Sequence, residues 1–151
     1  MTFTIEFLPQ DIPTDSGGCA RLGHILIGDL DELFVSLLGL WTSADYTVHW
    51  ENSVRRIVEA RTQSCLITSL SVPGESDLIR WWLLYPYADE VRIQESMLLH
   101  SCLARPFDHS KPYALIPHYH QRTAEGKAIS EWTIPLHDFE DFLKGPERER
   151  L

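Results

Sequence analysis

The chain has 151 residues, which is enough for one domain with a hydrophobic core, and its 44% hydrophobic and 11% aromatic content is typical of a folded globular protein. Its 22 Asp and Glu against 13 Lys and Arg give a formal net charge of −9, which disfavours nucleic acid as a partner. No apolar run approaches the roughly 20 residues that span a bilayer, and the N-terminus lacks a signal-peptide pattern, so we expect a cytoplasmic protein that does not enter a membrane.

The N-terminal part of the chain predicts two strands followed by a helix. Residues 2–8 alternate between apolar and polar side chains, and residues 22–27 are rich in β-branched and aliphatic residues, so both segments are expected to be strands. Gly28 ends the second strand. Asp29 is then expected to be a helix N-cap, with Glu32 completing a capping box for a helix over residues 30–40. The apolar stripe expected to face the core in this helix is Leu30, Leu33, Phe34, Leu37 and Leu38.

The rest of the chain predicts a longer helix, a β-meander and a C-terminal helix. The longer helix is expected over residues 46–60, with Ser43 or Asp45 as its cap. The predicted later elements are strands over residues 64–70, 79–85, 91–95 and 128–134, an extended loop over 106–117, a helix over 136–143 and a charged, frayed tail over 144–151. Residues 97–103 fit either a strand or a helical turn. Trp81 and Trp82 must point to opposite faces of their strand.

Together these elements predict an α+β fold in a single domain, residues 1–143. The domain is expected to be mainly antiparallel sheet, with a helix pair after the second strand and a short C-terminal helix. Three widely spaced cysteines, without a C-x-x-C motif, predict reduced thiols, with Cys65 and Cys102 in the core.

No segment carries a catalytic signature. His118 and His120 could bind zinc with His109 or His137 as a third ligand, but the chain has no H-E-x-x-H motif and solvated loop histidines are the simpler interpretation. We therefore expect no metal, no cofactor and no enzymatic activity.

A pattern spread over most of the chain resembles a known family. Its parts are Leu22-Gly23-x-Ile25-x-Ile27-Gly28-Asp29-x-x-Glu32-x-Phe34, Trp41-x-x-x-Asp45-Tyr46-x-x-x-Trp50, Ser64-Cys65-Leu66-Ile67-Thr68-Ser69, Trp81-Trp82-x-Leu84-Tyr85 and Ile129-Ser130-Glu131-Trp132. This pattern resembles the CdiI-like immunity proteins of bacterial contact-dependent growth inhibition systems. The resemblance implies a cytosolic protein that binds and neutralises the C-terminal toxin domain of a CdiA-like exoprotein, in many cases a nuclease.

The resemblance brings no interface residues with it, so the contact surface has to come from residue chemistry. Aromatic anchors supply affinity and complementary charge raises the association rate, so loops that combine both are the candidates. The predicted partner-binding residues are Glu75, Asp77, Tyr85, Tyr87, Asp89 and Glu90. A third candidate segment pairs Glu140 and Asp141 with Phe139 and Phe142. A regulatory or scaffold module is the main alternative function, followed by a metal-dependent enzyme using His118 and His120.

Overall fold

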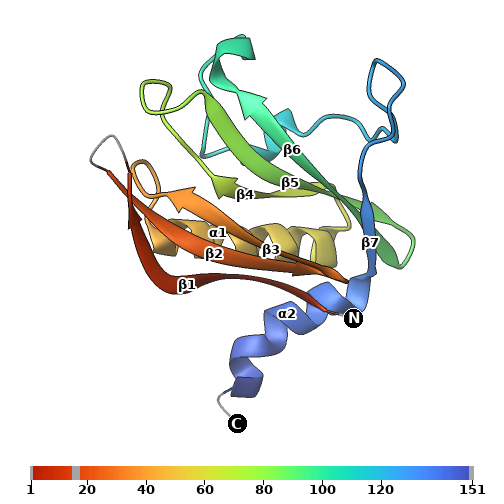
Figure 1. The fold of residues 1–151 in the computed structure, drawn as a ribbon. Helices are drawn as coiled ribbons and strands as arrows, with labels where there is room; N and C mark the ends of the chain where they lie inside the picture. Colours follow the sequence, from red (N-terminus) through yellow and green to blue (C-terminus); the bar gives the residue numbers. More distant parts are fainter. Residues whose placement is uncertain (1, 15–17, 150–151) are drawn as a thin grey trace.

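Seven strands form two antiparallel sheets within residues 2–14 and 18–149, the part of the chain that this computed structural model describes (Figure 1). The first sheet has the order β1-β2-β3, with β1 at Phe3–Pro13, β2 at Cys19–Ile27 and β3 at Leu30–Leu37. The second has the order β4-β5-β6-β7, with β4 at Ser64–Ser69, β5 at Leu78–Tyr87, β6 at Glu90–Leu99 and β7 at Trp132–Pro135. The helices are α1 at Ser43–Arg55 and α2 at Leu136–Glu149, with short turns η1 at Arg56–Ala60, η2 at His100–Cys102 and η3 at Pro112–Leu115. The predicted α+β class with antiparallel sheets is confirmed.

The first helix of the predicted pair is wrong, because residues 30–37 form strand β3. Gly28 and Asp29 make a two-residue turn between β2 and β3, with Ile27 opposite Leu30. Gly28 has a φ of 61°, and glycine at the first position of such a turn is a common hairpin signal. Asp29 is therefore a turn residue and no N-cap. Pairing along the whole of β2 outweighs the helical spacing of the leucines.

The close contact between β2 and β3 needs a glycine. A Cβ atom on Gly23 would lie 2.3 Å from Cζ of Phe34, the residue opposite it in β3. The Phe34 ring covers Gly23 and lies edge-on to the Trp50 ring of α1, with ring centroids 5.7 Å apart. Gly23 thus leaves room for the aromatic cluster between the first sheet and α1.

The second predicted helix is confirmed, with an earlier start and a different cap. Thr42 is the N-cap of α1: its side chain accepts a hydrogen bond from the Asp45 N–H at 3.2 Å, and the Asp45 carboxylate accepts one from the Thr42 N–H at 2.9 Å. Asp45 thus takes part as the distal residue of a capping box, and Ser43 is the first residue of the helix. A π-helical turn, η1, continues α1 to Ala60 and ends at Arg61, whose φ is 52°.

This difference in capping predicts a difference in stability. Thr42→Ala should lower the free energy of unfolding by about 1 kcal/mol, because it removes a side-chain cap from α1. Asp29→Ala, in the exposed turn, should change it by less than about 0.5 kcal/mol. Urea unfolding of the two variants provides the measurement. A larger loss for Asp29→Ala than for Thr42→Ala would contradict these roles.

The predicted meander of β4, β5 and β6 is confirmed, and both faces of this sheet are covered. The segment between η2 and β7, residues 103–131, lies over one face and is called the covering loop. There the Tyr85 hydroxyl donates to the Pro117 carbonyl at 2.9 Å, and the Gln94 side-chain amide donates to the His120 carbonyl at 2.8 Å. The other face packs into the core with the first sheet and the helices. Trp81 and Trp82 are accordingly only 1% and 2% exposed, on opposite faces.

Several predicted boundaries shift. β1 runs through the predicted loop to Pro13, with a register shift between Phe7 and Asp11. The ambiguous residues 97–103 divide between the end of β6 and η2. The predicted strand over 128–134 is reduced to β7, because Ala128 makes only an isolated bridge to Arg122. Helix α2 continues past the predicted end at residue 143 to Glu149, while residues 150 and 151 of the predicted tail lie outside the described residues.

The core lies between the first sheet, α1, α2 and the inner face of the second sheet. Trp50 of α1 lies at its centre: its ring contacts Phe7 at 4.8 Å between centroids, and its indole N–H donates to the Ile67 carbonyl at 2.8 Å. Phe139 of α2 packs on Phe3 at 4.5 Å, which joins the two ends of the chain. Cys65 is buried as predicted, but Cys102 is exposed in η2, so its assignment to the core is wrong.

Candidate functional site

The predicted partner-binding residues fall into two groups at opposite ends of strand β5. Glu75 and Asp77 precede the strand, whereas Tyr87, Asp89 and Glu90 lie at its far end and in the turn to β6. Strand β5, ten residues long, runs from Asp77 to the second group and spans about 30 Å. The structure therefore does not bring these residues together into one compact patch.

The first group is engaged with its own chain. The Asp77 carboxylate accepts hydrogen bonds from the Ser101 N–H at 2.8 Å and from the Ser101 hydroxyl at 2.7 Å. These two bonds hold the pKa of Asp77 below its usual value. Glu75 is half-buried beside Gly39, where a Cβ atom on that glycine would lie 3.2 Å from a Glu75 carboxylate oxygen. Asp77 thus joins the start of β5 to η2, whereas one carboxylate oxygen of Glu75 is buried without a hydrogen-bond partner.

The second group divides between buried and exposed residues. Tyr85 is buried, and its hydroxyl donates a hydrogen bond to the Pro117 carbonyl of the covering loop. The Tyr85 side chain therefore offers little surface to a partner. Tyr87 is 59% exposed, with the Arg92 guanidinium 4.1 Å from its ring centroid. Asp89 and Glu90 are exposed as well. That Tyr87, Asp89 and Glu90 contact a partner remains a prediction.

The third candidate segment packs inward through its aromatic residues. Phe139 is fully buried, and Phe142 lies edge-on to Phe3 with ring centroids 5.2 Å apart. These rings join α2 to the first sheet, so they are core residues and no contact surface.

The histidines do not form a metal centre in the described part of the chain. His118 and His120 are exposed on the covering loop, and His137 lies beside Asp138 at 3.2 Å. Within residues 2–14 and 18–149, no group of three His, Cys, Asp or Glu side chains is arranged to hold a metal ion. That the protein needs no metal stays a prediction, which elemental analysis of the purified protein can test.

A surface that the sequence did not indicate lies on the outer face of the first sheet. The strand register places Glu6, His24 and Leu33 side by side on this face, with the pairs Leu26–Asp31 and Leu22–Val35 on either side of them. Helix α1 packs on the opposite face (Figure 1). Leu33 is 60% exposed and Val35 is 43% exposed, so these apolar side chains face solvent.

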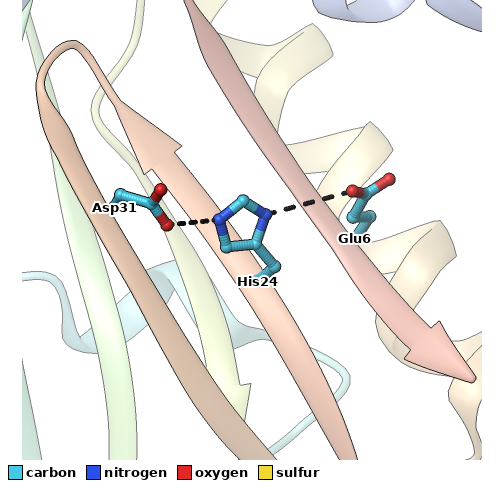
Figure 2. A network of polar contacts seen from close by, with 3 residues as sticks. All are labelled: Glu6, His24 and Asp31. Carbon is cyan, nitrogen blue, oxygen red and sulfur yellow. Dashed lines mark hydrogen bonds and ion pairs between the residues drawn. The ribbon is translucent and has the colours of Figure 1, made fainter. Parts of the chain in front are cut away.

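A short polar network crosses the middle of this face (Figure 2). His24 is hydrogen-bonded through Nε2 to the Asp31 carboxylate at 2.5 Å, and its Nδ1 lies 4.0 Å from the Glu6 carboxylate. Each of the three residues comes from a different strand. The hydrogen bond holds the Asp31 carboxylate in place, and both carboxylates remain largely exposed.

The geometry describes an α+β domain of two antiparallel sheets with an exposed, partly apolar sheet face. The family model of the CdiI N-terminal domain matches residues 36–142, and the chain belongs to this family. Its fold is similar to that of a chain in the solved "CdiA-CT/CdiI toxin and immunity complex from Enterobacter cloacae", with a TM-score of 0.84 and 23% identity over 97% of this chain and 99% of that chain. No curated protein matches the sequence. Among the helices of the described residues, none has the length and apolar character needed to cross a membrane.

Sequence reasoning missed the outer sheet face because it placed Leu33 in a buried helical stripe. One signal for a hairpin was available: Gly28-Asp29 between two β-rich runs is a turn dipeptide of the kind that joins paired strands. With that turn, strand alternation places Leu33 and Val35 opposite to Phe34, and hence outside.

Proposed function

We propose that this chain is an immunity protein that binds the C-terminal toxin domain of a CdiA-type exoprotein and blocks its activity. Membership of the CdiI family, through residues 36–142, is the observation that carries the proposal. The fold is consistent with it, because the similar chain of known structure belongs to a toxin and immunity complex. The protein acts by occupying a surface of the toxin, and it catalyses no reaction.

Two properties of the chain support a cytoplasmic role against a basic toxin. Cys19, Cys65 and Cys102 are all free, and the exposure of two of them fits a reducing compartment. The net charge of −9 favours association with a basic surface, as on a nuclease that binds the phosphates of its substrate. A basic toxin domain, for example a nuclease, is therefore the partner that this charge fits best.

A binding experiment tests this function. The purified protein should form a 1:1 complex with the toxin domain encoded in the same gene cluster, and its co-expression should restore growth to cells that produce this toxin. The association rate should fall about tenfold when salt rises from about 50 to about 500 mM, because exposed charges are then screened. Stopped-flow mixing and size-exclusion chromatography with light scattering provide the measurements.

A control separates specific recognition from general attraction between opposite charges. An unrelated toxin domain of similar charge should not be neutralised, since bulk attraction between opposite charges does not provide specific recognition. Absence of any complex with the cognate toxin domain at micromolar concentrations would overturn the proposed function.

A further inference from the structure

The outer face of the first sheet departs from the usual pattern of a sheet that faces water. An antiparallel sheet with one solvated face normally alternates apolar residues inside with polar residues outside. In β2 and β3 the outward positions include four aliphatic residues: Leu22, Leu26, Leu33 and Val35. The inward positions of the same strands include the buried Ile25 and Ile27. Apolar residues on both faces are typical of a sheet that is covered on both sides, and here the second covering is missing among the described residues.

The apolar residues on this face are contiguous. Leu33 and Val35 are two residues apart on one strand, which places their side chains on the same face, and Leu22 lies directly opposite Val35. Val48 on α1 and Leu115 in η3 are isolated exposed aliphatic residues. Met97 and Leu99 form a second exposed apolar pair, on β6, but the cation Arg80 lies directly opposite Met97, so this pair fits a basic partner less well. Single exposed apolar residues are normal on a protein surface, whereas an adjacent group more often marks an interaction site.

Apart from His24, which is charged only if protonated, the ionisable side chains on this face are acids. The Glu6 and Asp31 carboxylates flank His24 and lie next to Leu33 and Leu26 in the strand register. Neither Lys nor Arg occurs among the outward residues of the paired segments. The nearest cation along these strands is Arg21, which turns to the inner face, where its guanidinium donates to the Leu8 carbonyl at 2.9 Å and lies over the Phe7 ring. Such a face complements a basic surface that also exposes apolar side chains.

The position of this face relative to the family match favours a partner-specific role. The match begins at Ser36, so it covers α1 and the second sheet, whereas the outward residues from Glu6 to Val35 precede it. A surface that distinguishes one cognate toxin from another is expected outside the pattern that a family shares. The hydrogen bond between His24 and Asp31 also fixes one carboxylate before binding, which lowers the entropy lost on association.

We propose that the outer face of β1, β2 and β3 is the surface that docks the toxin domain, with Leu33 and Val35 as its apolar contact and Glu6 and Asp31 as its acidic contact. The inference rests on the proposed immunity function and names the contact surface for it. The partner is a toxin domain that presents Lys or Arg side chains around an apolar patch. Leu33 and Val35 provide the buried contact, and the two carboxylates raise the association rate.

Matched substitutions test the apolar contact. The double variant Leu33→Ser and Val35→Thr should weaken binding of the toxin domain at least about tenfold, mainly through faster dissociation. The control is the double variant Leu115→Ser and Val48→Thr, which makes the same chemical changes at exposed residues elsewhere. It should bind as the natural protein does. Surface plasmon resonance gives both rate constants, and thermal melting shows that each variant remains folded.

A second pair of substitutions tests the two carboxylates. Glu6→Gln together with Asp31→Asn should slow association several-fold at low salt and reduce the dependence of the association rate on salt, while the dissociation rate changes little. Tyr87→Ala with Glu90→Gln, at the far end of β5, tests the alternative contact at the β5–β6 turn. If the outer face alone docks the toxin domain, this variant keeps both rates unchanged.

The outcomes separate this inference from the function on which it rests. If the natural protein binds the toxin domain and the folded Leu33/Val35 variant binds it equally well, the docking surface is wrong and the immunity function stands. Loss of binding in the Tyr87/Glu90 variant alone would place the contact at the β5–β6 turn. If the natural protein binds no toxin domain, the immunity function itself fails.

Discussion

Acidification below about pH 6.5 is expected to destabilise the protein through His49, which is buried in α1. Its Nε2 accepts a hydrogen bond from the Ile67 backbone N–H at 2.8 Å, and burial lowers its pKa from 6.5 to about 3. Protonation of His49 would add a hydrogen to Nε2, which would then face the Ile67 N–H and could no longer accept its hydrogen bond. Between these two pKa values the unfolded chain binds the proton and the folded chain does not, so stability falls as the pH falls. The expected loss is up to about 1.4 kcal/mol per pH unit, or about 2–3 kcal/mol by pH 4.5.

The variant His49→Gln isolates this contribution. Glutamine can still accept a hydrogen bond but does not titrate, so the variant should be less stable at pH 7.5 and less dependent on pH between about 6.5 and 4.5. Urea unfolding of both proteins at a series of pH values gives the difference. Carboxylates with lowered pKa values, such as Asp77 and Asp108, titrate in both proteins and cancel. Parallel pH profiles for the two proteins would show that His49 is not responsible.

Removal of one hydroxyl group from Tyr46 should cost about 2–3 kcal/mol of unfolding free energy. This hydroxyl donates to the Leu37 carbonyl at 2.7 Å and accepts from the Leu70 N–H at 2.9 Å, so it connects the end of β3 to the segment after β4. Burial raises the pKa of Tyr46 to about 12. Tyr46→Phe keeps the ring but leaves a backbone donor and a backbone acceptor without their partner.

Tyr113→Phe is the matched control for this substitution. The Tyr113 hydroxyl is only partly buried, and its hydrogen bond is to the Ser53 hydroxyl at 3.0 Å, a group that can rotate to another partner. Its loss should cost less than about 1 kcal/mol. Chemical unfolding provides the comparison, and an equal effect of the two substitutions would contradict the role of Tyr46 as a connector between the sheets.

The sequence was sufficient for the elements whose patterns agree with their surroundings. Helix α1 has a polar start near Asp45 and a stripe of large apolar residues that includes Trp50, and it was predicted nearly in full. Strands β4, β5 and β6 follow one another with short connections, so their antiparallel pairing could be inferred from local signals.

The prediction failed at β3 because two periodicities fit the same residues. The leucines of residues 30–38 match a helical stripe, and Asp29 with Glu32 matches a capping box. The strand forms because Gly28 allows a tight turn and β2 offers a complete partner edge, which is a tertiary effect. Local propensity cannot settle such a competition.

The contact surface was harder to predict for the same reason. Glu75 and Asp77 are close in sequence to Tyr87 and Glu90, but an extended strand separates them in space. Conversely, Glu6, His24 and Asp31 are brought together only by the register of three strands. Sequence reasoning groups residues by their distance along the chain, whereas a sheet groups them across it.

The alternation of side chains along β2 and β3 has a consequence for how this protein can evolve. Ile25, Ile27 and Phe34 point into the core, while their immediate neighbours Leu26 and Leu33 point outward. The exposed residues among the outward positions, such as Leu33 and Val35, can therefore change without creating a cavity or overpacking the interior. Successive substitutions at the outward positions could follow a changing toxin, while the inward positions preserve the fold. The same short strands therefore allow surface residues to diverge rapidly beside core residues that diverge slowly.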